Sequence, residues 1–183
     1  MLLAVLVIAL VGAAWYYVGL FPGWMEQKIY PLEYEEMIDR YAGEYALEPA
    51  RVLAVIYCES SFRPDAVSSA GAIGLMQIMP ETGAWIAQKL NEPGYEQGRL
   101  FDPETNIRYG CWYLNYLDGR FDGDLTKATA AYHAGGGKVD QWLSDDAYSP
   151  DGQTLENIPF KATSAYVRHV RQVYEKYKEI TEA

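Results

Sequence analysis

The sequence predicts a mostly helical domain with one small loop or β-ribbon region, preceded by an apolar N-terminal segment. Three features of the chain favour this fold class. Apolar side chains recur every three to four positions in most segments after residue 33, as on the buried face of a helix. Proline stands where helices are expected to begin, at Pro49, Pro80 and Pro103, and it is well tolerated in a first helical turn. The segment of residues 68–79 is short and glycine-rich, which is typical of a loop or ribbon.

The first two helices of the domain are expected over residues 33–46 and 49–59. In the first, Ile38 and Tyr41 belong to a row of apolar and aromatic residues at helical spacing. The second can begin at Pro49, because the first turn of a helix leaves its amide groups without partners and proline has none to lose. This second helix is apolar on nearly every side, so we expect it to be buried.

The next helices are predicted from their start signals. A helix is expected from Pro80 to about Leu90, and residues 91–101 are expected to form a loop because they are polar and contain a proline and two glycines. Asp102 and Pro103 then form a strong helix start, a capping carboxylate followed by proline at the first position. This helix is expected to reach about residue 117.

The C-terminal third of the chain is also expected to be helical. Residues 125–134 form a predicted helix that ends at the glycine run of residues 135–137. A short helix is expected over residues 139–143, and a turn-rich loop over 144–159. The last helix is expected over residues 163–180, where apolar and aromatic side chains recur at helical spacing.

The N-terminal segment has the length of a membrane anchor. Residues 2–21 carry no charged side chain, and about 20 apolar residues in a helix span the roughly 30 Å hydrocarbon core of a bilayer. A cleaved signal peptide is the alternative; the missing basic region weakens it, and the small residues at 12–14 keep it open. We expect a transmembrane anchor over residues 1–24, a short linker over 25–34 and the main domain over 35–183.

Composition limits the classes of partner and cofactor. The chain has 183 residues and a formal net charge of −10, which argues against binding to nucleic acid backbones. Cys58 and Cys111 are the two cysteines, too few for a disulfide framework, and no Cys or His cluster indicates a zinc site. We expect two buried thiols, with a bridge between them as the alternative if the domain lies outside the cytoplasm.

Glu59 is the candidate catalytic residue. It ends the apolar helix, where desolvation and the negative end of the helix dipole both favour the protonated carboxyl. A carboxylic acid that stays protonated near neutral pH can donate a proton to a leaving-group oxygen, as cleavage of a glycosidic bond requires. Alone, the local pattern favours an ordinary solvated Glu at a helix end.

Five motifs occur in a recognisable order along the chain, and the first of them begins at Glu59. They are Glu59-Ser60-Ser61-Phe62, Ser68-x-x-Gly71-Ala72-x-Gly74-Leu75-Met76-Gln77-Ile78-Met79-Pro80, Asp102-Pro103-x-x-Asn106-Ile107-x-x-Gly110, Ala131-Tyr132-x-Ala134-Gly135 and Ile158-Pro159-Phe160-x-x-Thr163-x-x-Tyr166-Val167. Together they resemble the catalytic domain of the soluble-lytic-transglycosylase type of murein lyase, which has the mostly α, α+β lysozyme-like fold. The resemblance covers about residues 42–177.

The resemblance implies a lytic transglycosylase that acts on peptidoglycan glycan strands and needs no metal or other cofactor. Its members cleave the β-1,4 bond from N-acetylmuramic acid to N-acetylglucosamine, with one Glu as acid and then base, and this is Glu59 by motif position. The muramic acid 6-hydroxyl attacks C1, so the product is a 1,6-anhydro sugar and no water is consumed. Together with the apolar N-terminus, this implies a single-pass protein of the cytoplasmic membrane with an extracytoplasmic catalytic domain.

The resemblance also implies residues that line the glycan cleft. These are Ser68, Gln77, Met79, Tyr132 and His133, with Tyr132 expected to hydrogen-bond near the catalytic carboxyl. Each has a structural alternative: Ser68 as a turn residue, Met79 and Tyr132 as core. Gln77 is harder to explain as filler, since a buried amide needs partners.

The chain departs from the family pattern at two places. His133 stands where the family usually has Asn, which keeps a hydrogen-bonding group but adds a titratable one. The usual Glu-Thr-Arg appears as Ala162-Thr163-Ser164, so contacts made by that Glu and Arg are in doubt.

Two other functions compete with the lyase. A muramidase of the same fold would need a second carboxylate, and Asp65, Glu81 and Asp102 are candidates by composition alone. A murein-binding envelope protein without activity is the other alternative, which the departures at residues 133 and 162 favour and Glu59 disfavours.

Overall fold

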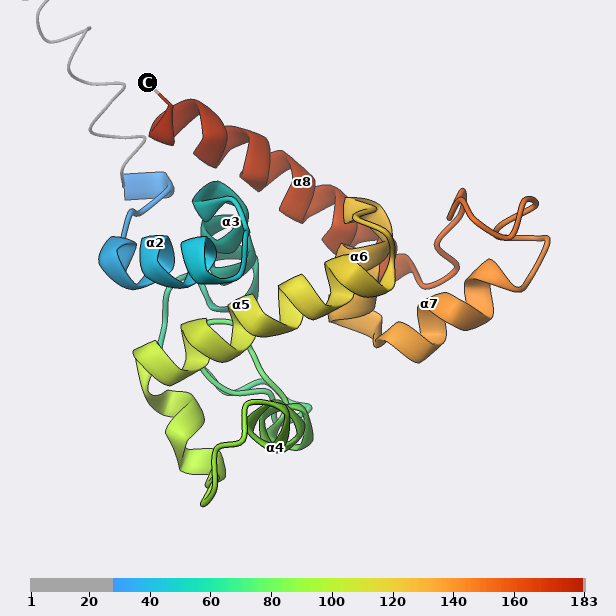
Figure 1. Ribbon diagram of the computed structural model, residues 1–183. Helices are drawn as coiled ribbons and strands as arrows, with labels where there is room; N and C mark the ends of the chain where they lie inside the picture. Colours follow the sequence, from blue (N-terminus) through green and yellow to red (C-terminus); the bar gives the residue numbers. More distant parts are fainter. Residues whose placement is uncertain (1–27, 183) are drawn as a thin grey trace, which may run out of the picture. The chain divides into compact units, whose positions relative to one another are not determined.

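Seven α-helices and one 3₁₀ helix make up most of residues 28–182, the part of the chain that the computed structural model describes (Figure 1). The α-helices are α2 (Glu35–Glu44), α3 (Pro49–Ser60), α4 (Pro80–Lys89), α5 (Pro103–Arg120), α6 (Leu125–Ala134), α7 (Gly136–Leu143) and α8 (Lys161–Thr181), and the 3₁₀ helix η1 is Gln97–Phe101. The mostly helical fold class is therefore confirmed. The only β structure in these residues is a pair of isolated antiparallel bridges, Val67 with Ile73 and Ile73 with Ile78, within the predicted ribbon.

The chain divides into two units, residues 1–33 and residues 34–183, and all the named helices belong to the second. The predicted transmembrane helix over residues 1–24 lies outside the described residues. Among residues 28–182, none of the helices combines the length with the apolarity that crossing a membrane would require.

Helix α3 lies at the centre of the second unit. Its residues 50–56 are all buried, as the apolar sequence predicts, and it packs most extensively against α8. In Figure 1, α8 (red) runs past α3 (teal) and α6, and the long α5 (yellow) runs below them. One buried ion pair joins α3 to α5: the Arg51 guanidinium donates two hydrogen bonds to the Asp118 carboxylate, at 2.6 and 2.8 Å.

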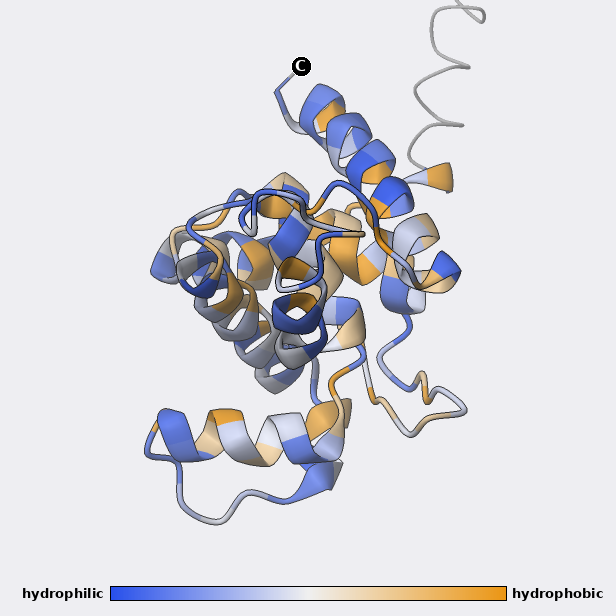
Figure 2. Ribbon diagram, turned by 90° about the vertical axis from the view of Figure 1, so that its right-hand side faces the viewer, coloured by the Kyte–Doolittle hydropathy of each residue, from blue (hydrophilic) through white to orange (hydrophobic). Residues whose placement is uncertain are grey.

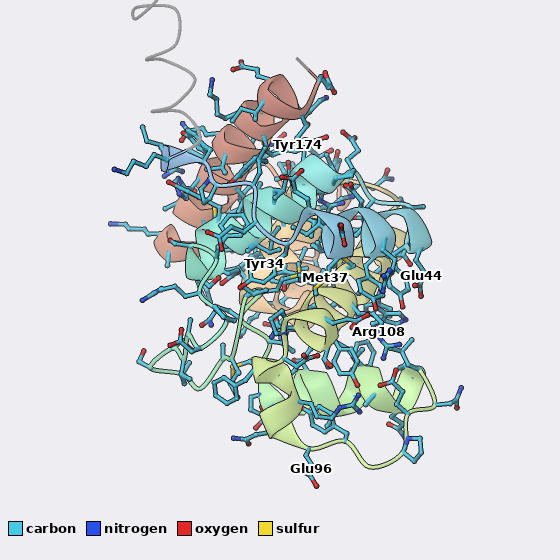
Figure 3. The ribbon with its side chains drawn as sticks, turned by 90° about the vertical axis from the view of Figure 1, so that its left-hand side faces the viewer. Tyr34, Met37, Glu44, Glu96, Arg108 and Tyr174 are labelled. Carbon is cyan, nitrogen blue, oxygen red and sulfur yellow. The ribbon has the colours of Figure 1, made fainter. Side chains whose placement is uncertain are left out.

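Helix α4 and η1 attach to the rest of the unit through α5. Both pack against α5 and against each other, and they form the lowest part of this unit in Figures 1 and 2. Glu92, in the loop after α4, accepts hydrogen bonds from Arg108 and Tyr109 of α5. Figure 3 shows Arg108 between α2 and the loop that carries Glu96. These contacts hold α4, η1 and the loop between them in place against α5.

The largest differences from the prediction are in three places. Residues 97–101 form η1 inside a predicted loop, since a five-residue 3₁₀ helix is too short to show a helical repeat. Helix α5 continues from the predicted end near residue 117 to Arg120. Helix α7 begins at Gly136 rather than residue 139, because Gly135 alone, with φ 88°, makes the turn from α6.

Candidate active site

The carboxyl group of Glu59 lies in the last turn of α3 and is half-buried. Burial raises its pKa to about 7, and a hydrogen bond from Tyr166 offsets part of that rise. The Tyr166 hydroxyl donates to Glu59 Oε1 at 2.5 Å. A tyrosine donor stabilises the carboxylate, whereas the apolar surroundings stabilise the protonated acid. The group is thus balanced between its two protonation states near neutral pH, as an acid that must later act as a base requires.

The chain reverses direction immediately after Glu59. Ser61 and Phe62 adopt left-handed backbone angles, with φ 51° and 61°, which end α3 and lead the chain into the ribbon. The buried Ser60 hydroxyl donates to the Leu75 carbonyl at 2.7 Å. The end of α3 that carries Glu59 is therefore tied directly to the ribbon that follows it.

Asn106 of α5 holds the ribbon from the other side. Its side-chain oxygen accepts from the Met76 amide at 2.7 Å, and its amide nitrogen donates to the carbonyls of Ile73 and Leu100 at 2.9 and 2.7 Å. A side chain at Gly74 would collide with this amide group, and Gly74 also has φ 80°. Asn106 and Gly74 thus act together to bring the ribbon against α5.

A cavity of about 250 Å³ lies between the ribbon and α6. It brings together four of the predicted cleft residues, Gln77, Met79, Tyr132 and His133. The Gln77 side-chain nitrogen donates to the carbonyls of Ala66 and Gly74 at 3.1 and 2.9 Å, which ties this side chain to the ribbon. The cavity therefore has polar groups from the ribbon on one side and aromatic groups from α6 on the other.

Tyr132 and Ser68 have structural partners of their own. The Tyr132 hydroxyl donates to the Met76 carbonyl at 2.8 Å and not to Glu59, whose hydrogen bond comes from Tyr166. Burial and then the charge of Glu59 raise the pKa of Tyr132 well above its ordinary value, which keeps this hydroxyl a donor. Ser68 does not line the cavity; its hydroxyl accepts from the Ala72 amide at 3.0 Å within the ribbon turn.

One of the departures from the family pattern, His133, lies beside Thr163 and Tyr166. His133 Nδ1 lies 3.1 Å from the Thr163 hydroxyl oxygen, and the His133 and Tyr166 rings are 4.6 Å apart. Burial lowers the pKa of His133 below its ordinary value. The imidazole is therefore neutral at neutral pH and adds no positive charge near Glu59.

The other predictions about titratable groups have clear outcomes. Asp102 caps α5, accepting from the Thr105 amide at 2.8 Å, so its carboxylate is engaged in the fold. Both cysteines are free thiols; Cys111 is buried, as expected, whereas Cys58 is only half-buried, and burial raises the pKa of Cys58 to about 12. Within residues 28–182, no cluster of three or more His, Cys, Asp or Glu side chains could hold a metal ion.

Sequence reasoning missed the roles of Tyr166 and Asn106 at this site. Both residues stand in the motifs that carry the resemblance, which is the signal that could have identified them. The motifs name both residues, but the sequence assigns neither Asn106 to the ribbon nor Tyr166 to Glu59.

Comparisons with known proteins agree with this geometry. A family model described as Transglycosylase SLT domain matches residues 36–154. The soluble lytic murein transglycosylase of Escherichia coli (strain K12) is 38% identical over 150 residues, which are 81% of this chain and 23% of that protein. The membrane-bound lytic murein transglycosylase C of Photorhabdus laumondii is 33% identical over 138 residues, 70% of this chain and 38% of that protein.

Two solved structures share the fold. The lytic transglycosylase Slt of Pseudomonas aeruginosa, an inactive mutant, superposes with a TM-score of 0.75 and 35% identity over 84% of this chain and 25% of that one. The 70 kDa soluble lytic transglycosylase of Escherichia coli gives a TM-score of 0.77 and 34% identity over 85% of this chain and 26% of that one. The chain thus spans about a quarter of the length of these two structures.

Proposed function

The chain belongs to the Transglycosylase SLT domain family, and from this premise we propose that it is a lytic transglycosylase of peptidoglycan. It cleaves the β-1,4 bond from N-acetylmuramic acid to N-acetylglucosamine without water and leaves a 1,6-anhydro-muramic end. The observation that carries the proposal is the Glu59 carboxyl, whose pKa is about 7 and which receives a hydrogen bond from Tyr166.

In the first step, the protonated Glu59 donates its proton to the glycosidic oxygen, and the bond from that oxygen to C1 of muramic acid breaks. The leaving N-acetylglucosamine departs as an alcohol, and the N-acetyl oxygen of the muramic acid stabilises the positive charge at C1. Glu59 is now a carboxylate, and the Tyr166 hydroxyl stabilises this form through its hydrogen bond.

In the second step, the Glu59 carboxylate removes the proton from the muramic acid 6-hydroxyl. The resulting oxygen nucleophile attacks C1, which closes the 1,6-anhydro ring, and Glu59 is protonated again. The residue ends the cycle as it began, so no second carboxylate and no water molecule takes part. Gln77, Met79, Tyr132 and His133, which line the cavity, hold the sugars in this scheme.

The test is mass spectrometry of the muropeptides that the full chain, solubilised in detergent, releases from purified sacculi. Anhydro-muramic ends are expected, and Glu59→Gln should release none. Products with ordinary reducing ends, one water heavier, would instead indicate a muramidase. Glu81 would then be the carboxylate to examine first, since Asp102 is engaged in the cap of α5. Binding to sacculi without release would indicate the murein-binding protein.

We further propose that residues 1–24 anchor the protein in the cytoplasmic membrane, with residues 35–183 on the outer face where murein is found. The support is the uncharged sequence of residues 2–21 and a length of about 20 residues, enough to span the roughly 30 Å bilayer core. The protein should stay in the membrane fraction after an alkaline wash. Its main domain should be digested by protease added to spheroplasts, and protection there would contradict the orientation.

A further inference from the structure

A cavity of about 280 Å³ lies between α6 and α8 and includes Arg51 of α3 in its lining. It shares no lining residue with the cavity beside Tyr132. Most of its wall is apolar and comes from four residues: Leu125, Val167, Val170 and Tyr174. The proposed reaction does not use this cavity.

The cavity has the size of one small aliphatic molecule. At about 30 Å³ for each water-sized group, its volume holds about nine non-hydrogen atoms. Leucine and methionine are of this size, and an N-acetylhexosamine is larger. Val167 and Val170 in the wall are 6% and 3% exposed, so an aliphatic group that enters is removed from water, which favours its binding.

Thr129 places a hydroxyl group in this apolar wall. The residue lines the cavity and is 8% exposed. Its hydroxyl makes no hydrogen bond with another of residues 28–182, although buried polar groups are normally paired. The hydroxyl is therefore available to a polar group of a ligand.

Two side chains of opposite charge line the cavity from one face of α8. Arg171 and Glu175 are both exposed, and residues four positions apart are neighbours on a helix surface. The Arg171 guanidinium donates to the Thr126 hydroxyl of α6 at 2.8 Å, which directs it across the cavity. Glu175 forms no ion pair within residues 28–182. A cation and an anion are thus both open to a ligand.

The other polar groups of the lining are engaged in the fold. The Arg51 guanidinium donates two hydrogen bonds to Asp118. Tyr174, labelled in Figure 3, lies where α8 packs against α3, and its hydroxyl donates to Glu48. The charges that remain for a ligand are therefore the two on the exposed face of α8.

We propose that this cavity binds a free aliphatic α-amino acid of about the size of leucine. The side chain lies against Val167 and Val170. The carboxylate accepts hydrogen bonds from Arg171 and Thr129, and the ammonium group donates to Glu175. A fatty carboxylate would leave an anion facing Glu175, whereas a zwitterion pairs with both charges. This site goes beyond the proposed reaction and does not depend on it.

The test is equilibrium dialysis of radiolabelled leucine, as each enantiomer, against the full chain in lipid nanodiscs, with empty nanodiscs as the blank. At least one enantiomer should bind with a dissociation constant of about 1 mM or lower. 4-Methylpentanoate, which is leucine without its ammonium group, should bind at least about tenfold more weakly, because it loses a charge-assisted hydrogen bond. Absence of leucine binding up to about 10 mM, or tighter binding of 4-methylpentanoate, overturns the proposal.

Variants at the two charges identify the groups that bind. Glu175→Gln should weaken leucine binding at least about tenfold but should not weaken 4-methylpentanoate, because an amide does not repel its carboxylate. Glu179→Gln is the matched control, since Glu179 is exposed on α8 and does not line the cavity.

Arg171→Ala should weaken both ligands, and the exposed Arg168, also outside the lining, supplies its control as Arg168→Ala. These side chains are all exposed, so the variants should fold. Equal leucine affinity in the Glu175→Gln and Glu179→Gln chains would overturn the site.

Discussion

Glu59 has two opposing neighbours, an apolar environment and a tyrosine donor. Burial favours its acid form and the Tyr166 hydrogen bond favours its carboxylate. A single residue that acts first as acid and then as base works best when neither form is strongly preferred at the working pH. The pKa of about 7 meets this condition without a second carboxylate.

The first prediction concerns the alkaline limb of the pH profile. Because Glu59 must be protonated to begin the reaction, kcat/KM should fall about tenfold per pH unit above pH 7. The Tyr166→Phe chain loses the donor that stabilises the carboxylate, so the pKa of Glu59 rises and the limb moves to higher pH. Tyr132→Phe is the matched control, since Tyr132 donates to Met76 and its loss should leave the limb in place. A limb that moves equally in both variants would contradict the assignment.

The second prediction concerns stability. Glu59 has a folded-state pKa of about 7 against an ordinary value of 4.5, so the native state binds more protons than the unfolded state between these values. Stability should therefore fall as pH rises from 4.5 to 7. Glu59→Gln avoids this loss. The unfolding free energy of this variant minus that of the wild type should therefore be up to about 3 kcal/mol larger above pH 7 than at pH 4. Urea unfolding at pH 4 and pH 8 measures this, and a difference independent of pH would show that Glu59 is well solvated.

The third prediction concerns His133. Burial lowers the pKa of this imidazole, so it is neutral wherever the alkaline limb is measured, and His133→Asn should leave the limb unchanged. Any change in kcat/KM should be confined to acidic pH, where His133 becomes charged beside Tyr166. A limb displaced in this variant would mean that His133 carries a proton at neutral pH.

At the scale of elements, the ribbon depends on contacts made by side chains rather than on a regular sheet. It has two isolated bridges, and its position is set by Ser60 from α3 and Asn106 from α5. The polar atoms that Asn106 satisfies are buried with it, since Asn106 is 1% exposed. One wall of the cavity beside Tyr132 thus depends on one amide side chain.

The fourth prediction follows from this dependence. Asn106→Ala leaves the Met76 amide and the carbonyls of Ile73 and Leu100 without this partner, and it should cost about 3 kcal/mol of stability, given about 1–3 kcal/mol for each buried group left unpaired. Activity should fall as well, because Gln77 and Met79 lose their fixed positions. Asn106→Asp should also be destabilised at neutral pH, since a carboxylate accepts from Met76 but cannot donate to the two carbonyls. Chemical denaturation and turnover of sacculi measure both effects.

Much of this architecture could be predicted because its signals are local. The cap and proline at Asp102 and Pro103 identify the start of α5, and the all-apolar α3 identifies the buried helix. The contact of Tyr166 with Glu59 joins residues 107 positions apart, and no local pattern specifies such a pairing. The left-handed angles of Ser61, Phe62 and Gln77 were also beyond prediction, since residues other than glycine rarely adopt them.

At the scale of the whole domain, α3 is the element that the others share. It packs against α2 and α8, and its Arg51 pairs with Asp118 of α5. The Arg51 and Asp118 side chains are 7% and 22% exposed, so the pair is largely removed from water. Such a pair contributes little net stability when intact but is costly to break, because one charge is left buried.

The fifth prediction tests this ion pair. Asp118→Ala should cost about 3 kcal/mol of unfolding free energy, since it leaves the Arg51 guanidinium without its partner. Replacing both residues, as in Arg51→Met with Asp118→Leu, should recover most of that loss. Glu179→Ala is the control, because its pair with Lys176 is exposed and should change stability by less than about 1 kcal/mol. Equal losses in the Asp118 and Glu179 variants would mean that Arg51 is hydrated in the folded protein.

The distance along the chain between Glu59 and Tyr166 also bears on biosynthesis. Glu59 is made early, but the burial and the hydrogen bond that tune it need α8, which begins at Lys161. A nascent chain that has not reached α8 exposes this carboxyl to water, where it is ionised at neutral pH and cannot donate a proton. Under the proposed function, glycan cleavage therefore begins only after the last helix has docked, and a chain that lacks α8 is inactive.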